Sequence, residues 1–278
     1  MVCDRGINQN LMTLEEMRQH EWVVSWSGGK DSTSTIILMH ENKIPVKKIV
    51  YVRMMYDEKM PATLPKMIDF VLRGKSVFES WGYPVEVVPS IKTALQVAST
   101  VYHKSKYEYN NGNQYGISAF LRGGCKFTTI KQKTIEKQIS DDDYQMIGYA
   151  VNEYDRVRRL RANKQSILVA LNIFSSDTYG ICRKYNLLSP LYNTSFSRDG
   201  CFFCPNANKR ERESMRAEHP ELIERIDKLI SMTNRTALDN IKTKNHWLED
   251  YFAMLKEQAD PYKQVSLDFF RNVEEVCA

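Results

Sequence analysis

Short apolar runs alternate with segments of helical periodicity through the first half of the chain. Runs rich in β-branched and aromatic residues predict strands at residues 22–26, 45–52, 83–88 and 144–150. Apolar positions at helical spacing predict helices between these strands, at residues 34–40, 64–81 and 126–137. This alternation predicts an α/β fold in which a parallel sheet carries helices on both faces. In such a sheet, ligands bind at the carboxyl ends of the strands.

The pattern changes after about residue 163, where helical segments replace the alternation. Further helices are predicted at residues 166–171, at 177–185 and within 210–255, with prolines at the joints between them. The polar, Asn- and Gly-rich residues 104–124 predict a long loop beside the site. We therefore expect an α/β domain at residues 1–163 and a helical C-terminal region at 164–278.

The composition is typical of a globular protein. The chain has 278 residues, of which 42% are hydrophobic and 26% charged, enough for one large domain or a domain with an appendage. We expect a cytoplasmic protein with no membrane partner, because no apolar run approaches the ~18 residues of a membrane helix and the first residues lack the apolar core of a signal peptide. A formal net charge of +5 suits an anionic ligand, nucleotide or nucleic acid, without choosing between them.

Two glycines separate the first predicted strand from the first predicted helix, in the sequence Ser27-Gly28-Gly29-Lys30-Asp31-Ser32. Such a junction leaves the first helical amides unpaired beside the positive end of the helix dipole, so an anion should bind there. The glycines allow close approach of phosphate oxygens, Lys30 adds charge, and the serines add hydroxyl donors. The spacing differs from the nucleoside-triphosphatase P-loop, which has Gly, four residues and then Gly-Lys-Ser/Thr. A glycine-rich turn that only closes a β-α unit is the alternative.

Charged residues crowd the end of the fourth predicted strand: Glu153, Asp155, Arg156, Arg158 and Arg159. A ligand of an α/β sheet would lie at this edge, where these charges would bind it. A solvated, charged helix start explains the same composition equally well.

Cysteines form a second motif, Cys201-Phe-Phe-Cys204-Pro. Two thiolates three positions apart in a turn can face one soft metal ion, and Cys125 and Cys182 are the interior cysteines that could complete a four-thiolate set. Four thiolates would hold zinc or an iron–sulfur cluster. A redox disulfide or an unligated pair also fits a single CxxC, and Cys182, in a predicted helix, could simply pack as a small hydrophobic residue.

Together, these motifs resemble the phosphoadenosine phosphosulfate (PAPS) reductase family of the adenine-nucleotide α-hydrolase superfamily, whose pyrophosphate loop is Ser-Gly-Gly-x-Asp-Ser. The resemblance rests on the loop at 27–32, the Gly-Cys and Lys-rich helix ending at 137, the Glu/Arg motif at 148–159 and the block at 188–205. The bacterial and phage-type branch, which includes sulfur-transfer enzymes of DNA phosphorothioation, is the more similar one. The resemblance implies a HUP-type α/β fold, adenine-nucleotide binding at the loop and, in several branches, a 4Fe-4S cluster on the cysteines equivalent to Cys125, Cys201 and Cys204.

Two differences between this sequence and the assimilatory members of the family bear on the reaction that the resemblance implies. Assimilatory PAPS reductases have a degenerate loop and a C-terminal Glu-Cys-Gly-Leu/Ile-His motif, whereas this chain keeps the complete loop and ends in Val-Glu-Glu-Val-Cys-Ala. The resemblance therefore favours a PP-loop enzyme that splits ATP into AMP and pyrophosphate, adenylates an acceptor and serves sulfur transfer. A sulfonucleotide (PAPS or APS) reductase or sulfotransferase stays open, as does a non-catalytic nucleotide- or nucleic-acid-binding module with structural zinc.

Each candidate residue then has an expected role. We expect Lys30 and Asp31 to be catalytic, Lys30 on the leaving pyrophosphate and Asp31 as a ligand of Mg²⁺. The resemblance implies that Glu153 holds ribose, Mg²⁺ or acceptor, and that Arg156 or Arg158 holds a phosphate. We expect Cys125 to join the Cys201/Cys204 pair beside the nucleotide, with thiolates roughly 4–7 Å apart. The expected partners are the adenine nucleotide and a nucleic acid or sulfur donor.

Overall fold

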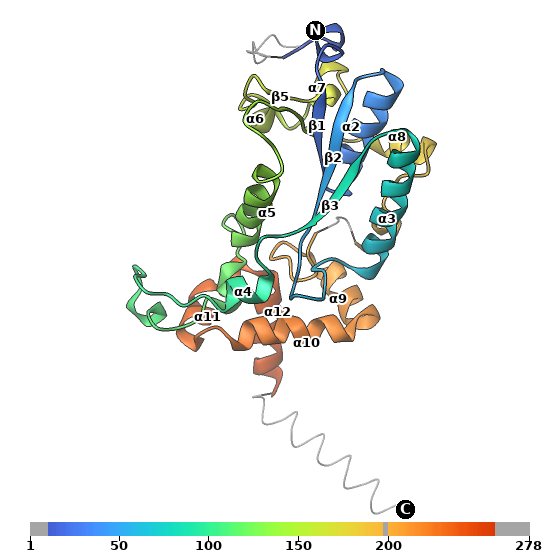
Figure 1. The fold of residues 1–278 in the computed structure, drawn as a ribbon. Coiled ribbons are helices and arrows are strands. Elements are labelled where there is room, and N and C mark those ends of the chain that lie inside the picture. The colour runs from blue at the N-terminus through green and yellow to red at the C-terminus, as the bar shows by residue number, and fades with distance from the viewer. Residues whose placement is uncertain (1–10, 197–199, 259–278) are drawn as a thin grey trace, which may run out of the picture. The chain divides into compact units, whose positions relative to one another are not determined.

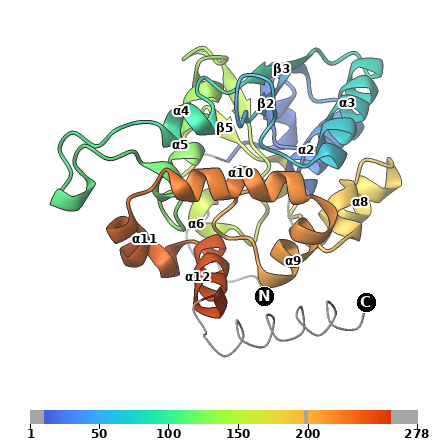
Figure 2. The same ribbon diagram turned by 90° about the horizontal axis from the view of Figure 1, so that it is seen from below.

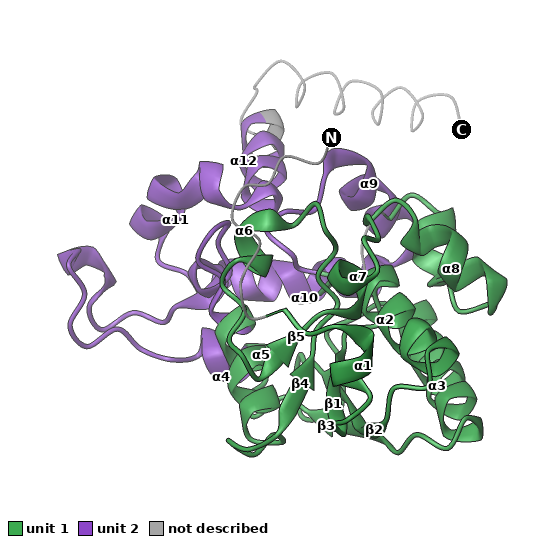
Figure 3. Ribbon diagram, turned by 90° about the horizontal axis from the view of Figure 1, so that it is seen from above, with its two compact units in different colours: residues 1–94, 128–202 green, residues 95–127, 203–278 purple. Residues whose placement is uncertain are grey.

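The computed structural model describes residues 11–196 and 200–258 (Figure 1). The chain divides into two compact units, of which unit 1 contains residues 1–94 and 128–202, and unit 2 contains residues 95–127 and 203–278 (Figure 3). Both units are therefore discontinuous in sequence. Residues 164–202, predicted with the C-terminal region, lie in unit 1. The expected division into an α/β domain at 1–163 and a helical C-terminal region at 164–278 stays a prediction.

Unit 1 carries the sheet. Its strands are β1 (Trp22–Trp26), β2 (Val46–Arg53), β3 (Val85–Pro89), β4 (Tyr144–Met146) and β5 (Lys164–Gln165). Its helices are α1 (Leu14–Met17), α2 (Lys30–Glu41), α3 (Pro65–Ser80), most of α5 (Lys126–Glu136), α6 (Tyr154–Val157), α7 (Ile167–Ala170), α8 (Thr178–Lys184) and the 3₁₀ turn η3 (Pro190–Asn193). The four predicted strands are present, although β4 is shorter than predicted. The two-residue β5 lies in a segment without a strand pattern.

All strand pairs are parallel, and the strand order is β3-β2-β1-β4-β5. Val24 of β1 stands opposite Ile49 of β2 on one side and Met146 of β4 on the other. β2 and β3 therefore follow β1 on one side of the sheet. The chain then crosses over, and β4 and β5 lie on the other side of β1. The predicted α/β fold with a parallel sheet is confirmed, and β1 is its middle strand.

Helices lie on both faces of the sheet, as alternate residues of β1 show. The Trp26 ring meets the Phe78 ring of α3 at 5.1 Å, and a Cβ on Gly74 of α3 would come within 2.7 Å of the same indole. Ser25 points the other way, where its hydroxyl accepts a hydrogen bond from Gln145 Nε2 at 2.9 Å and lines a cavity together with α5. The indole therefore anchors α3, while the serine leaves room on the α5 face.

Unit 2 is helical, and its second segment, from residue 203 onward, carries helices of the predicted helical C-terminal region (Figure 2). Its elements are most of α4 (Ala94–Ala98), η1 (Glu108–Asn110), η2 (Gly116–Ala119), α9 (Lys209–Glu218), α10 (Pro220–Ser231), α11 (Arg235–Ile241), η4 (Lys242–Lys244) and α12 (His246–Gln258). Asn208 begins α9 with a capping box, and Pro220 occupies the first turn of α10, where its missing N–H costs nothing. None of the helices in the described chain has the length and apolar character that a membrane crossing requires.

The predicted loop at 104–124 contributes to the core of unit 2 in its second half. Ile117, Ala119 and Phe120 are fully buried. The Ile117 amide donates to Thr233 Oγ1 of the α10–α11 connection at 2.8 Å, and Gly116 has a φ of +51° at this contact. The sequence pattern missed this packing because the buried residues come after a polar, Asn-rich stretch.

A buried ion pair joins α9 to α12 within unit 2. The Arg212 side chain is only 6% exposed, and its Nε and Nη2 donate to the two carboxylate oxygens of Asp250 at 2.7 and 2.9 Å. Its Nη1 donates to the Ala207 carbonyl at 2.8 Å. Burial raises the pKa of Asp250, but the hydrogen bonds from Arg212 and Arg216 outweigh it, so this pKa lies below its ordinary value.

Replacing Asp250 with Asn is expected to lower the free energy of unfolding at pH 7 by about 3 kcal/mol, because Arg212 stays buried without its main counter-charge. Since folding lowers the Asp250 pKa, the pair contributes fully above the ordinary carboxyl pKa of ~3.9 and loses that contribution as pH falls through the folded value. Urea unfolding between pH 7 and pH 2.5 measures both effects. The exposed pair Arg235–Asp239 provides the control, Asp239→Asn, which should cost less than ~1 kcal/mol. Equal losses in the two variants would contradict this prediction.

Candidate anion-binding site

The Ser27–Ser32 loop leaves the carboxyl end of β1 and enters α2 directly. Gly28 has a φ of +83°, a backbone conformation in which any other side chain would be strained, so glycine is favoured there. Gly29 is the N-cap of α2, with a φ of −73° and no side-chain cap. The amides of the first turn of α2 therefore lie at the end of the middle strand without a side-chain cap from the N-cap residue, and the Lys30 amide donates a long hydrogen bond of 3.4 Å to the Tyr192 hydroxyl.

The two loop serines bind one another. The Ser32 hydroxyl accepts from the Ser27 amide at 3.1 Å, lies 2.9 Å from the Ser27 hydroxyl, and donates to the Gly29 carbonyl at 3.0 Å. The Gly29 amide in turn donates to Ser27 Oγ at 3.3 Å. These hydroxyls fix the shape of the loop, a role that the sequence analysis did not assign to them.

Lys30 and Asp31, the two predicted catalytic residues, form an ion pair. Lys30 Nζ lies 2.7 Å from Asp31 Oδ1 and also donates to the Ser175 carbonyl at 2.8 Å. The Asp31 carboxylate accepts from Ser175 Oγ at 3.0 Å and from Thr178 Oγ1 at 2.8 Å. The segment before α8 thus binds both side chains. Lys30 must exchange these partners for phosphate oxygens if it is to meet an anion at the loop.

Gly148 brings the chain after β4 against the start of α2. A Cβ on Gly148 would lie 2.7 Å from both the Cα and the N of Ser32 and 2.9 Å from the carbonyl carbon of Asp31. These are backbone atoms that no side-chain rotation can move. The absence of a side chain at Gly148 therefore allows the β4 connection to approach the loop after β1, next to it in the sheet.

A cavity of about 510 Å³ opens over this junction within unit 1. It is lined by Ser25, Ser27, Gly29, Lys30, Asp31, Ser32, Lys131, Ile147, Gly148, Tyr149, Glu153, Arg156 and Tyr192. The structure thus brings the loop at 27–32 together with Glu153 and Arg156, and the binding roles expected of these residues stay predictions. The lining carries Lys30, Lys131 and Arg156, so cations outnumber the two carboxylates and the cavity favours an anion.

Glu153 and Arg156 act as a pair at the rim of this cavity. Glu153 Oε1 accepts from Arg156 Nη1 at 2.6 Å, and Oε2 accepts from the Ala150 amide at 3.2 Å. The Arg156 guanidinium lies over the Tyr149 ring at 5.5 Å. Arg158 is placed differently: it does not line this cavity, and its Nε lies 3.7 Å from Asp155 Oδ1, with both side chains exposed. The geometry therefore separates the two arginines that the sequence analysis left as alternatives.

Removing the charge of Arg156 or of Glu153 by substitution with Gln is expected to weaken nucleotide binding by about 1–3 kcal/mol each, the magnitude of a charge-assisted hydrogen bond. Arg158→Gln is the matched control, because Arg158 has the same chemistry outside the cavity lining. Titration of each variant with ATP measures the effect. Unchanged affinity in Arg156→Gln, or an equal loss in Arg158→Gln, would mean that the cluster is a solvated surface.

The cysteines are divided between the two units. Cys182 and Cys201 belong to unit 1, whereas Cys125 and Cys204 belong to unit 2. Cys182 is fully buried between α2 and α8, with its Sγ 3.2 Å from Ser34 Oγ and 3.3 Å from the Lys30 carbonyl oxygen. These four residues form no disulfide in the described chain. Among the described residues, no group of three or more His, Cys, Asp and Glu side chains is arranged to hold a metal ion, and the shared cysteine site stays a prediction.

Sequence reasoning missed several residues that shape the site. Ser175 and Thr178 bind Lys30 and Asp31 from about 145 positions along the chain, and no local pattern marks them. The hydroxyl of Tyr192 accepts a long hydrogen bond of 3.4 Å from the Lys30 amide. Tyr192 lies within the Leu-Ser-Pro-Leu-Tyr block, so that block was the one available signal.

No family model and no curated protein matches this sequence. Among solved structures, the chain is similar to the U34-tRNA thiolase NcsA from Methanococcus maripaludis with its [4Fe-4S] cluster. The sequence identity is 13% and the TM-score is 0.36, and the match covers 82% of this chain and 76% of the thiolase. The function of the chain must accordingly be inferred from its own residues.

Proposed function

We propose that this protein is a PP-loop enzyme that binds ATP at the Ser27–Ser32 loop and splits it into AMP and pyrophosphate, transferring the adenylyl group to an acceptor. The observation that carries the proposal is the position of the complete Ser-Gly-Gly-Lys-Asp-Ser sequence at the carboxyl end of the middle strand. Gly28 has a positive φ there, and the first turn of α2 lacks a side-chain cap. Ligands of α/β sheets bind at this edge, where the strand order reverses between β1 and β4.

Different residues around the loop have different roles in this reaction. The amides at the start of α2 bind the β- and γ-phosphates and stabilise the charge that develops on the leaving pyrophosphate. Lys30 adds a positive charge once it exchanges its Ser175 contact for a phosphate oxygen, and the Asp31 carboxylate holds Lys30 near the loop until then. Arg156, at the rim, is available to the α-phosphate.

A magnesium ion suits this donor set. Mg²⁺ usually binds through one or two carboxylates together with substrate phosphates, and Asp31 is the carboxylate in the loop itself. When bound, the ion neutralises charge on the phosphates and orients the leaving group. Asp31 would have to give up hydrogen bonds from Lys30 and Thr178 to reach it.

The proposal extends to sulfur transfer through a cysteine-bound 4Fe-4S cluster, with zinc as the alternative metal. Its support is the Cys201–Cys204 motif together with Cys125, and we derive no reaction step from it because the described residues do not form a metal site. Protein purified anaerobically is expected to contain iron and to absorb near 400 nm. Cys201→Ser and Cys204→Ser should lose the iron, whereas Cys182→Ser should retain it because Cys182 packs against α2. Zinc in place of iron would indicate a structural site, and equal metal content in all three variants would refute the motif as a ligand set.

Competition between nucleotides tests the proposal against a sulfonucleotide reductase. ATP is expected to bind, pyrophosphate is expected to displace it, and PAPS is expected to bind more weakly because it has no β–γ pyrophosphate for the loop. Tighter binding of PAPS than of ATP would support the reductase instead. ATP binding without any AMP formation in the presence of Mg²⁺ and candidate acceptors would support a non-catalytic nucleotide-binding module.

A further inference from the structure

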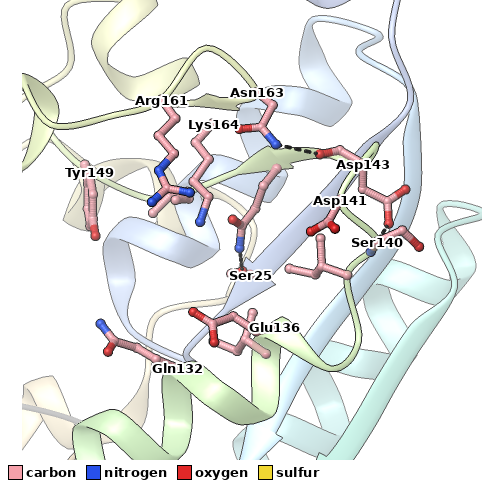
Figure 4. Close-up of a pocket in the computed structure, with 14 residues that line it drawn as sticks. Ser25, Gln132, Glu136, Ser140, Asp141, Asp143, Tyr149, Arg161, Asn163 and Lys164 are labelled. Atoms are coloured by element: carbon pink, nitrogen blue, oxygen red, sulfur yellow. Dashed lines mark hydrogen bonds between the residues drawn. The ribbon is translucent and has the colours of Figure 1, made fainter.

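A second cavity, of about 590 Å³, lies on the α5 face of the sheet in unit 1 (Figure 4). Its walls come from α5, the residues before β4, the strands β1 and β4, and the turn that leads into β5. Polar and charged side chains point into it, including Gln132, Glu136, Arg161, Asn163 and Lys164 (Figure 4). Its volume is in the range of pockets that hold small molecules. The proposed ATP chemistry at the loop does not use it.

Two cations in this cavity, Arg161 and Lys164, are not held in an ion pair by the carboxylates of the lining. Arg161 and Lys164 flank one turn, in which the Lys164 amide donates to the Arg161 carbonyl at 2.9 Å, and both side chains point into the cavity (Figure 4). Neither side chain forms an ion pair within the part of the chain that the structure describes, whereas Asp143 in the same lining is paired with Lys47 at 2.6 Å. Two neighbouring cations without a carboxylate partner repel each other, so an anion bound between them would be favourable.

The carboxylates of the lining set the orientation of a ligand. Glu136 and Asp141 also face the cavity, from α5 and from the segment before β4. Their negative charge opposes an anion near them, so the anionic group of a ligand is directed to Arg161 and Lys164. The amide of Gln132 and the amide oxygen of Asn163, whose Nδ2 donates to the Asp143 carbonyl at 3.4 Å, are available to hydrogen-bond a neutral, polar remainder.

The second cavity adjoins the first. Ser25, Ile147 and Tyr149 line both cavities, so molecules bound in the two would contact the same three residues. Ser25 lies inside the middle strand, and its small side chain leaves the cavity open beside β1. An acceptor in the second cavity is thus placed next to a nucleotide at the loop.

We propose that this cavity is the acceptor site and that it binds a phosphate ester, with the phosphate on Arg161 and Lys164 and a polar body that carries the reacting hydroxyl. The inference rests on the proposed ATP chemistry for the role of acceptor. In the reaction, the acceptor oxygen forms a bond to the α-phosphorus of ATP, the bond between the α-phosphorus and the α–β bridging oxygen breaks, and pyrophosphate leaves with that electron pair. The hydroxyl proton passes to water.

Calorimetric titration with ribose 5-phosphate, on full-length protein saturated with the non-hydrolysable analogue α,β-methylene-ATP, tests the site. The analogue fills the loop, so ribose 5-phosphate reports on the second cavity alone. Saturable binding is expected, and the double variant Arg161→Gln/Lys164→Gln should weaken it at least tenfold while its affinity for the analogue changes less than twofold. Lys133→Gln/Lys137→Gln, which removes two exposed cations outside the lining, is the matched control and should bind like the unaltered protein.

The outcomes separate this inference from the ATP assignment. Absence of saturable binding, or an equal loss in both double variants, would overturn the second site even if ATP is cleaved to AMP. Specific binding that depends on Arg161 and Lys164 would support the site even if no pyrophosphate is ever released, and the ATP chemistry alone would then fail. Weaker binding of the analogue by Arg161→Gln/Lys164→Gln would overturn the separation of the two cavities.

Discussion

Replacing Gly29 with valine is expected to reduce pyrophosphate release from ATP at least a hundredfold, while the protein stays folded. Gly29 has a φ of −73°, which valine can adopt, so the backbone tolerates the change. The branched side chain would, however, stand at the N-cap of α2, where phosphate oxygens must reach the main chain. Losing such contacts to a developing charge costs about 10²–10³ in rate, or roughly 2.7–4 kcal/mol. A pyrophosphate-release assay, with circular dichroism to verify folding, measures the effect.

The control for this variant is Gly180→Val, a glycine of α8 with open space around its missing Cβ. It should retain full activity. Asp31→Ala is expected to resemble Gly29→Val, because Lys30 loses the carboxylate that holds it beside the loop. Pyrophosphate release at the normal rate in Gly29→Val or in Asp31→Ala would remove the loop from the reaction.

Replacing Gly148 with alanine is expected to destabilise unit 1 by about 1–3 kcal/mol, the usual cost of forcing extra volume into a packed interior. The new methyl group would lie 2.7 Å from backbone atoms of Ser32, so either the connection after β4 or the start of α2 must shift. The shift would also move Glu153 and Arg156 away from the loop, and nucleotide affinity should fall with stability. Urea unfolding and ATP titration measure the two effects.

Gly180→Ala is the matched control for Gly148→Ala and should be neutral or slightly stabilising, because alanine favours a helix interior. If Gly148→Ala had the stability and ATP affinity of the control, the close contact between the β4 connection and α2 would be unimportant for the site.

The sequence predicted the parts of the fold and site that depend on local patterns. The apolar run at Trp22–Trp26, the two glycines after it and the helical spacing that follows identified β1, the loop and α2. Strand, turn and helix each have their own periodicity or residue type. It could not predict that Ser175 and Thr178 bind Lys30 and Asp31, since this contact depends on the packing of α8 against α2. Nothing in the sequence favoured Arg156 over Arg158, because only the geometry of α6 distinguishes them.

Division of the chain into discontinuous units was also beyond a local pattern. Residues 95–127 leave the sheet after β3, and η2 packs with α10 and α11. Ile117 and Phe120, which are buried there, come after a polar stretch, and the Phe120 ring meets the Phe203 ring at 4.8 Å. The prediction of a loop described the polar stretch but missed the buried residues at its C-terminal end. A local pattern is also insufficient to predict the metal ligands. The CxxC spacing is local, whereas any further ligand must come from a distant part of the chain.

Product analysis with ATP labelled at the α-phosphate tests the central claim most directly. Protein in excess over the nucleotide, with Mg²⁺, is mixed with [α-³²P]ATP and the products are separated. Cleavage at the loop between the α- and β-phosphates predicts that the label appears in AMP or an adenylated acceptor, with one pyrophosphate for each labelled product, and that Gly29→Val forms neither. Label in ADP, with inorganic phosphate released instead, would contradict the proposed reaction.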